Sequence, residues 1–167
     1  TGLTVNKDGR LFDRFRGRVI FPIHNLTGKV IGFGGRILKR DKKTAKYLNS
    51  PESEIYNKSR ILYGFYQARR AISKQGKCYL VEGYTDVLAF HQAGIEAVVA
   101  SSGTSLTEQQ IKMVQRITPN LTIVFDGDAA GIHASLRGID MVLAQEMNVR
   151  IVLLPEGEDP DSFAKKH

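Results

Sequence analysis

The stretch VFDGDAAG, residues 124–131, decides the fold that we expect for this chain. Two acids, Asp126 and Asp128, lie on either side of one glycine, directly after the apolar run LTIVF at 121–125. Two like charges about 4 Å apart repel each other by roughly 4 kcal/mol at an effective dielectric constant of about 20. A bound cation would offset this repulsion, so the stretch predicts a buried strand that ends at a cation site.

The region around this stretch alternates short apolar runs with helical segments. The apolar runs predict strands at 78–81, 96–101, 121–125 and 149–155. Helices are expected at 85–92, 105–117 and 129–146, the second opened by a capping box of Ser105 and Glu108. Continuous apolar strands are typical of a sheet covered on both faces. The alternation therefore predicts an α/β fold with a mainly parallel, doubly wound sheet and flanking helices.

The region upstream of Gly76 has a different pattern. RVIFPI at 18–23 and KVIGFGGRIL at 29–38 are rich in β-branched and aromatic residues and predict a hairpin around the turn HNLTG. The polar stretch at 38–53 is expected to be a loop, and 63–74 a helix that ends at Gly76. We therefore expect a smaller α+β subdomain before the α/β domain.

The charge divides the chain at the same place. Residues 1–75 hold 17 Lys and Arg against 5 Asp and Glu, a balance of +12, whereas the whole chain carries +7. Residues 76–167 therefore carry −5. Basic surface favours polyanions such as nucleic acid or nucleotide phosphates, although two solvated faces without a partner would show the same split. The expected domains are a basic one at 1–75 and an acidic one at 76–167.

Several classes of protein are excluded by simple counts. No apolar run reaches the length of a membrane span, and the N-terminus lacks the apolar core of a signal peptide. Cys78 is the only cysteine, which excludes a disulfide framework and an all-cysteine metal site. The single cysteine fits a reducing, cytoplasmic setting. Because the chain has no initiator Met, we expect a piece of a longer protein.

Acids follow three of the four predicted strands. Glu82 comes after the first, Asp126 and Asp128 after the third, and Glu156 to Asp161 after the fourth, while Asp86 lies four residues beyond Glu82. In doubly wound sheets, ligands bind at the carboxyl ends of the strands. Oxygen-only clusters suit Mg²⁺. A helix cap at Asp128, another at Asp159 before Pro160, and a salt bridge at Glu82 remain the structural alternatives.

Three acidic motifs together resemble the Toprim module: VEGYTDV at 81–87, DGDAAG at 126–131 and EDPDSF at 158–163. Four upstream motifs, RFRGRVIFPI, GFGGR, KYLNSPES and NKSRILYG, look like the catalytic core of bacterial DnaG-type primases. The resemblance covers nearly the whole chain. It implies a DNA-directed RNA polymerase that writes short RNA primers on single-stranded DNA for replication, by two-metal nucleotidyl transfer.

The resemblance also implies roles for individual residues. It implies that the principal metal ligands and catalytic groups are Glu82, Asp126 and Asp128. It also implies that the acidic cluster is completed by Asp86, Asp159 and Asp161. Nucleotide-binding motifs contain Arg36, Lys46, Tyr47, Asn49 and Lys58. The basic entry for nucleic acid contains Arg14, Arg16 and Arg18.

The implied cofactor is Mg²⁺ or Mn²⁺, with zinc expected only in an N-terminal domain that this piece lacks. The implied partners are a single-stranded DNA template, an RNA primer, ribonucleotides, and a replicative helicase that binds through a missing C-terminal domain. A helical end to the core is also missing. We expect a monomeric fragment in the bacterial replisome, without a membrane partner and with weak or no activity by itself.

Other functions would use the same acids. A Toprim topoisomerase needs a tyrosine nucleophile, normally in another domain, and a Toprim nuclease would cut rather than extend a strand. A nucleic-acid-binding scaffold would use the acids only to place a structural ion. A phosphatase with Asp126 as nucleophile would leave the basic region unexplained. The glycines of GFGGR at 32–36 could cradle phosphate or, as glycines in a hairpin, only permit tight backbone bends.

Overall fold

A computed structural model describes residues 2–39, 44–103, 105–125, 138–155, 157 and 158. The chain forms two compact units, Thr1–Asn57 and Lys58–His167. The units divide upstream of the boundary expected from charge. The reason is that helix α1 (Phe65–Gln75) carries basic residues outside but buries Phe65, Ala68 and Ile72 in the core of the second unit.

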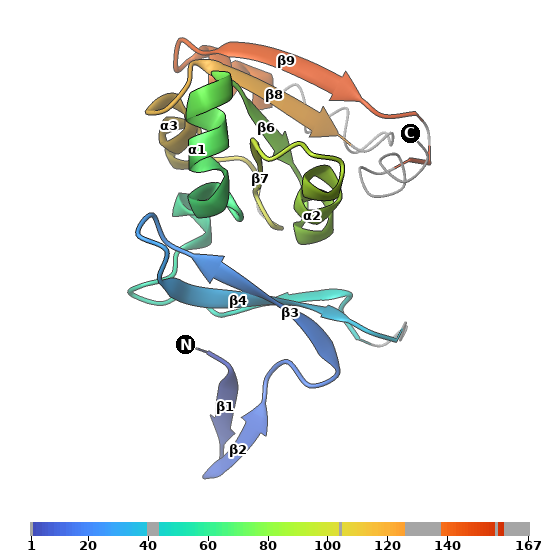
Figure 1. The fold of residues 1–167 in the computed structure, drawn as a ribbon. Helices are drawn as coiled ribbons and strands as arrows, with labels where there is room; N and C mark the ends of the chain where they lie inside the picture. Colours follow the sequence, from blue (N-terminus) through green and yellow to red (C-terminus); the bar gives the residue numbers. More distant parts are fainter. Residues whose placement is uncertain (1, 40–43, 104, 126–137, 156, 159–167) are drawn as a thin grey trace. The chain divides into compact units, whose positions relative to one another are not determined.

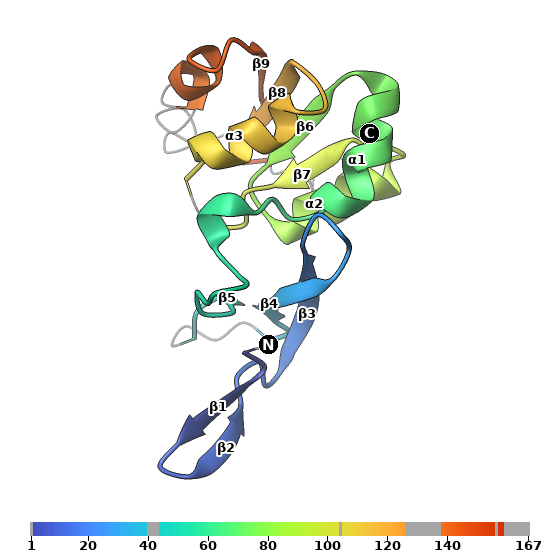
Figure 2. The ribbon, with the colours of Figure 1, turned by 90° about the vertical axis from the view of Figure 1, so that its left-hand side faces the viewer.

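The first unit consists of β-structure. Strand β1 (Thr4–Lys7) pairs with β2 (Arg10–Asp13), and a second antiparallel sheet has the order β3 (Arg18–His24), β4 (Val30–Ile37), β5 (Tyr47–Asn49) (Figure 2). The predicted hairpin is confirmed as β3 and β4. Its turn is closed by the side chain of Asn25, whose Oδ1 accepts hydrogen bonds from the backbone N–H of Thr27 and of Lys29.

The prediction of an uninterrupted loop at 38–53 is wrong. Strand β5 lies within it, and Tyr47 pairs with Arg36 of β4. The sequence signal was weak because β5 has only three residues, all half-buried, between polar stretches. Strand β4 therefore has partners on both edges.

Two glycines of the GFGGR motif permit close packing of aromatic rings. A Cβ on Gly35 would lie 2.5 Å from Cδ1 of Phe15, and one on Gly32 would lie 3.1–3.3 Å from the ring of Tyr56. Both rings are buried, and burial, followed by the nearby charge of Glu52, raises the pKa of Tyr56 to about 12. The structure thus gives Gly32 and Gly35 a role in packing against aromatic rings, which neither interpretation from the sequence included.

The second unit contains the predicted parallel sheet. Its strands are β6 (Cys78–Val81), β7 (Val98–Ala100), β8 (Asn120–Phe125) and β9 (Asn148–Leu153), in the spatial order β7-β6-β8-β9 (Figure 1). All three neighbouring pairs are parallel. The observed fold is therefore the expected α/β sheet after a small antiparallel subdomain.

Helices cover both faces of this sheet. Alternate strand residues such as Leu80 and Ile123 pack with α1 and α3 (Glu108–Gln115) in one apolar cluster. The intervening Val81 and Val124 pack with Val87 of α2 (Tyr84–Gln92) in another. Because successive strand residues face opposite sides, the apolar runs serve two cores at once. This explains why they lack polar alternation.

Two helix predictions need correction. Helix α3 begins after Thr107, not at Ser105, and its capping box pairs Thr107 with Gln110. Of the long helix predicted at 129–146, residues 138–143 are helical and 144–146 form a turn. Residues 129–137 lie outside the described residues. None of the helices in the described ranges is long and apolar enough to cross a bilayer.

The sole cysteine belongs to the larger apolar cluster. Cys78 on β6 is fully buried, and burial raises the pKa of its thiol. A thiol in this position is inert, because the reactive species is the thiolate. Its role is packing.

We predict that Gly35→Ala destabilises the first unit by about 1–3 kcal/mol, because the new methyl group overlaps the buried ring of Phe15. Chemical denaturation with a probe in this unit measures the loss. Gly138→Ala is the control, since the nearest atom to its Cβ lies at an ordinary 3.7 Å. Equal stability of Gly35→Ala and wild type would contradict the packing role.

Candidate metal and nucleotide sites

The carboxyl edge of the parallel sheet is the candidate metal site. Strands β6, β8 and β9 are neighbours, and these are the three strands that the acids follow. Parallel pairing puts their carboxyl ends, Val81, Phe125 and Leu153, at one edge. Strand β7, which no acid follows, is at the outside of the order. The topology therefore brings together the three points at which acidic segments leave the sheet.

Glu82 is the acid best placed among the described residues. It comes directly after β6, and its side chain is exposed. Its backbone is fixed by the segment that follows β7: the N–H of Ser102 donates to the carbonyl of Glu82 at 3.0 Å, and that of Ser101 donates to the carbonyl of Val81 at 3.4 Å. An exposed carboxylate whose backbone is held by hydrogen bonds is well suited to bind a metal ion.

Asp86 has a structural contact that the metal hypothesis did not include. It is only 9% exposed, and its Oδ2 accepts a hydrogen bond of 2.8 Å from the N–H of Gly83 at the start of α2. An acid at this helix position that bonds back to the cap residue is one half of a capping box. The carboxylate thus holds the backbone next to Glu82. The spacing of Gly83 and Asp86 was the signal available in the sequence.

The four other predicted metal ligands, Asp126, Asp128, Asp159 and Asp161, lie outside the described residues. Within the described ranges, no three His, Cys, Asp or Glu side chains gather into a group that could hold a metal. Only Glu82 and Asp86 of the six predicted acids are described, so the complete ligand set remains a prediction.

The candidate nucleotide site in the first unit centres on Tyr47. The guanidinium carbon of Arg36 lies 6.0 Å from the centroid of its ring, and Nζ of Lys46 lies 5.6 Å from it. Both cations are exposed and the ring is half-buried. Two cations beside an aromatic face can offer charge to phosphates and a stacking surface to a base. Strand pairing therefore brings together three of the five predicted nucleotide-binding residues.

The remaining two predicted nucleotide-binding residues lie elsewhere. Asn49 is on β5, opposite Gly34 of β4, and is half-buried. Lys58 belongs to the second unit, where it begins the 3₁₀ turn η1 (Lys58–Arg60). Four of the five residues thus share the first unit, and the fifth belongs to the second unit.

The three arginines expected at the nucleic-acid entry have different surroundings. Arg18 holds backbone carbonyls of β4 and of the residues before β5. Its Nη2 donates to the carbonyl of Ala45 at 2.9 Å, and its Nη1 donates to the carbonyls of Gly35 and Lys46 at 3.3 Å each. Arg14 is half-buried, and its Nη2 donates to the carbonyl of Asn49 at 3.4 Å. Arg16 is exposed. The bracing contacts of Arg18, which support Lys46, had no signal in the sequence.

We predict that Asp86→Ala lowers the free energy of unfolding of metal-free protein by about 1 kcal/mol through loss of the cap. Asp86→Asn retains an oxygen that can accept from Gly83 and should stay within about 0.5 kcal/mol of wild type. Urea unfolding in a chelator measures both. Equal losses in the two variants would contradict the cap. With Mn²⁺ added, a smaller gain in Tm for Asp86→Asn would show that the residue also binds metal.

Comparison with known proteins agrees with this arrangement. Residues 1–69 match the family described as DNA primase catalytic core, N-terminal domain, and residues 79–164 match the Toprim-like family. The chain is 49% identical over its whole length to the DNA primase of Halalkalibacterium halodurans, and 46% identical over 98% of its length to that of Escherichia coli K12. It spans 28% of each relative.

Solved structures show the same similarity. The E. coli primase catalytic core has a TM-score of 0.90 and 46% identity, with 99% of this chain and 53% of that chain covered. The structure of the zinc-binding and RNA polymerase domains of the Aquifex aeolicus primase has a TM-score of 0.92 and 41% identity, with 98% and 41% covered. The two family matches follow one another along the chain, at residues 1–69 and 79–164. The chain therefore belongs to the bacterial DnaG-type DNA primase family, of which it contains core N-terminal and Toprim sequence.

Proposed function

We propose that this chain forms the nucleotidyl-transfer centre of a primase, which extends an RNA primer with ribonucleotides on a single-stranded DNA template. The supporting observation is the adjacency of β6, β8 and β9, which directs three acidic segments of a Toprim domain to one edge. A basic unit with cations beside Tyr47 precedes that domain. The combination suits a reaction between two phosphate-bearing substrates.

The residues at the edge fit a hard divalent cation. Their donor set consists of carboxylate oxygens, which Mg²⁺ and Mn²⁺ accept, and Glu82 presents an exposed carboxylate on a fixed backbone. The ligands would be Glu82, Asp126 and Asp128, with Asp86, Asp159 and Asp161 completing the cluster. When bound, a pair of such ions activates an attacking hydroxyl and steadies a leaving phosphate oxygen.

The basic groups of the chain would bind and orient the nucleotide. Arg36 and Lys46 would neutralise the triphosphate, while Tyr47 stacks on the base or supports the two cations. Asn49 and Lys58 would add contacts to the sugar or phosphates. Arg16, the exposed member of the arginine group, would contact the template directly, and Arg14 and Arg18 would act mainly through the backbone that they hold.

The other partners are proposed from relatives. One similar structure is a DnaG catalytic domain bound to single-stranded DNA, which supports a template of that kind. The zinc-binding domain of the Aquifex relative supports zinc in another domain of the full protein. We further propose a helicase partner, a monomeric state and a cytoplasmic location. The functional division into a nucleotide-binding region at 1–75 and a metal-binding region at 76–167 is part of the same proposal.

One assay separates primase activity from the alternatives. It contains template, ribonucleotides, a pre-annealed primer and Mn²⁺. Extension of the primer supports the proposal, strand cutting supports a nuclease, and binding without turnover supports a scaffold. The complete natural polypeptide is used, because this chain spans only part of its relatives.

We predict that Glu82→Gln and Asp126→Asn each reduce extension at least a hundredfold while the fold persists, because each removes a charged ligand that the transition state needs. Single-turnover extension with Mn²⁺ measures the loss, and circular dichroism checks the fold. Glu96→Gln is the matched control, since Glu96 is exposed just before β7, at the opposite edge of the sheet. Wild-type rates in either site variant would refute the metal site.

We predict that Arg36→Ala raises the apparent KM for ribonucleotide about tenfold with little change in kcat, because a charge-assisted phosphate contact is lost. The control is Arg69→Ala on α1, which removes another arginine stacked on a tyrosine, 4.6 Å from the ring of Tyr66. Nucleotide titrations of extension rate provide both values. An unchanged KM in Arg36→Ala would remove this residue from the nucleotide site.

A further inference from the structure

A fully buried glutamine in the second unit is not among the predicted ligands. Gln110 on α3 has no exposed surface, and the other buried residues of that helix are Ile111 and Val114. Its Nε2 donates to the carbonyls of Lys58 at 3.0 Å and Ile61 at 2.9 Å. Its Oε1 accepts from the N–H of Thr107 at 3.1 Å. Both donors and one acceptor site of the amide are therefore used.

Two neighbours of Gln110 bind the same turn. Thr107 donates from Oγ1 to the carbonyl of Ser59 at 2.6 Å, and its Oγ1 accepts from the N–H of Gln110 at 3.2 Å. Gln109 accepts from Nε of Arg60 at 2.9 Å. We call Thr107, Gln109 and Gln110 the α3 clamp. It contacts each of the four residues 58–61.

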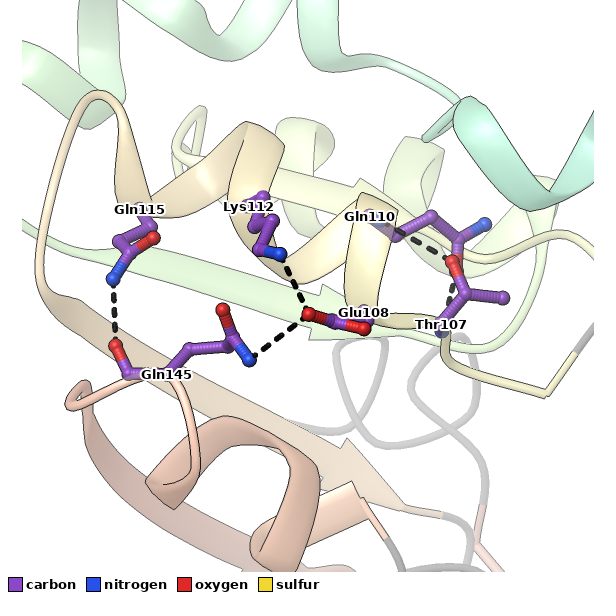
Figure 3. Close-up of polar contacts among 6 residues, drawn as sticks. All are labelled: Thr107, Glu108, Gln110, Lys112, Gln115 and Gln145. Carbon is purple, nitrogen blue, oxygen red and sulfur yellow. Dashed lines mark hydrogen bonds and ion pairs between the residues drawn. The ribbon is translucent and has the colours of Figure 1, made fainter.

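The α3 clamp is itself held in place (Figure 3). Along α3, Glu108 pairs with Lys112 at 2.6 Å and accepts from Nε2 of Gln145 at 3.3 Å. At the other end of the helix, Nε2 of Gln115 donates to the carbonyl of Gln145 at 2.6 Å. Hydrogen bonding to Lys112 lowers the pKa of Glu108, which keeps it charged. Gln145 thus holds α3 at both ends of the helix.

The turn that the clamp holds is weak by itself. It has three 3₁₀ residues, a conformation with poorer hydrogen-bond geometry than an α-helix, and its closing bond from Ile61 to Lys58 is 3.4 Å long. An apolar side chain would fill the space of Gln110 without the cost of burying an amide. A buried polar network with every donor used instead fixes one arrangement of the groups it joins.

We propose that Gln110 is a positioning residue for Lys58. It holds the backbone of Lys58 so that the ammonium group meets the phosphates of the incoming nucleotide. This inference rests on the proposed function, in which Lys58 is a nucleotide-binding residue. Ser102, which lies between β7 and α3, binds the backbone of Glu82. Ser102 and the α3 clamp therefore hold the backbone of a predicted metal ligand and of the predicted phosphate-binding lysine.

The test uses Gln110→Met, which keeps volume but loses all three hydrogen bonds, in the complete natural polypeptide. We expect the apparent KM for ribonucleotide in primer extension to rise about tenfold, with kcat changed less than twofold. Asn120→Leu is the control, because it removes an amide-to-carbonyl bond, 2.8 Å long to Gly76, at the amino end of β8 and outside the clamp. An unchanged KM in Gln110→Met overturns the inference.

A double-mutant cycle with Lys58→Ala shows whether Gln110 acts through Lys58. If it does, Gln110→Met adds no further rise in KM to Lys58→Ala. Independent, multiplying effects would assign Gln110 a merely structural role and overturn the inference. If Lys58→Ala itself leaves nucleotide KM unchanged, the proposed role of Lys58 falls. If Lys58→Ala raises KM and Gln110→Met does not, only the positioning inference falls.

A second pair of variants covers failure of Gln110→Met to fold. Thr107→Val removes the hydroxyl's bonds to the carbonyl of Ser59 and to the N–H of Gln110 with little change in shape, and Thr107→Ser retains the hydroxyl. We expect Thr107→Val to raise the nucleotide KM about threefold and Thr107→Ser to behave as wild type. Equal KM values in the two variants would contradict a positioning role for the clamp.

Discussion

The candidate site depends on the parallel pairing of β6, β8 and β9. Parallel strands end at the same edge, so short acidic segments that are distant in sequence leave the sheet side by side. The pairing is stabilised by apolar residues on both faces, and helices cover each face. The core thus determines the edge at which these segments leave the sheet.

The sequence predicted this sheet well because its signals are local. Strands β6 and β7 and most of β8 are apolar runs, and the observed order matches a doubly wound sheet. It failed where a tertiary contact decides the outcome. Strand β5 forms because β4 offers an edge, and α3 starts at Thr107 because that hydroxyl also reaches Ser59. Helix α1 packs in the second unit although it precedes the change of charge, because it is basic outside and apolar inside.

For the candidate site, the sequence predicted which residues lie there better than it predicted what each side chain contacts. Glu82 is exposed at the expected edge, whereas Asp86 has a carboxylate oxygen committed to the start of α2. Arg36 and Lys46 lie beside the ring of Tyr47, and Arg18 is used largely to hold backbone. Gln110 carries no sequence signal, because a glutamine on a short helix is normally exposed. Supporting residues of this kind become visible only through their contacts.

The burial of Cys78 has a practical consequence for measuring how the two units are arranged. Because the native thiol is shielded within β6, reagents specific for sulfhydryls should leave it unmodified in folded protein. A pair of cysteines placed on exposed strand positions, one in each unit, could then carry spin labels or fluorophores without background from this chain. Distances between such labels, with and without template, would report whether substrate changes the spacing of the basic unit from the acidic sheet.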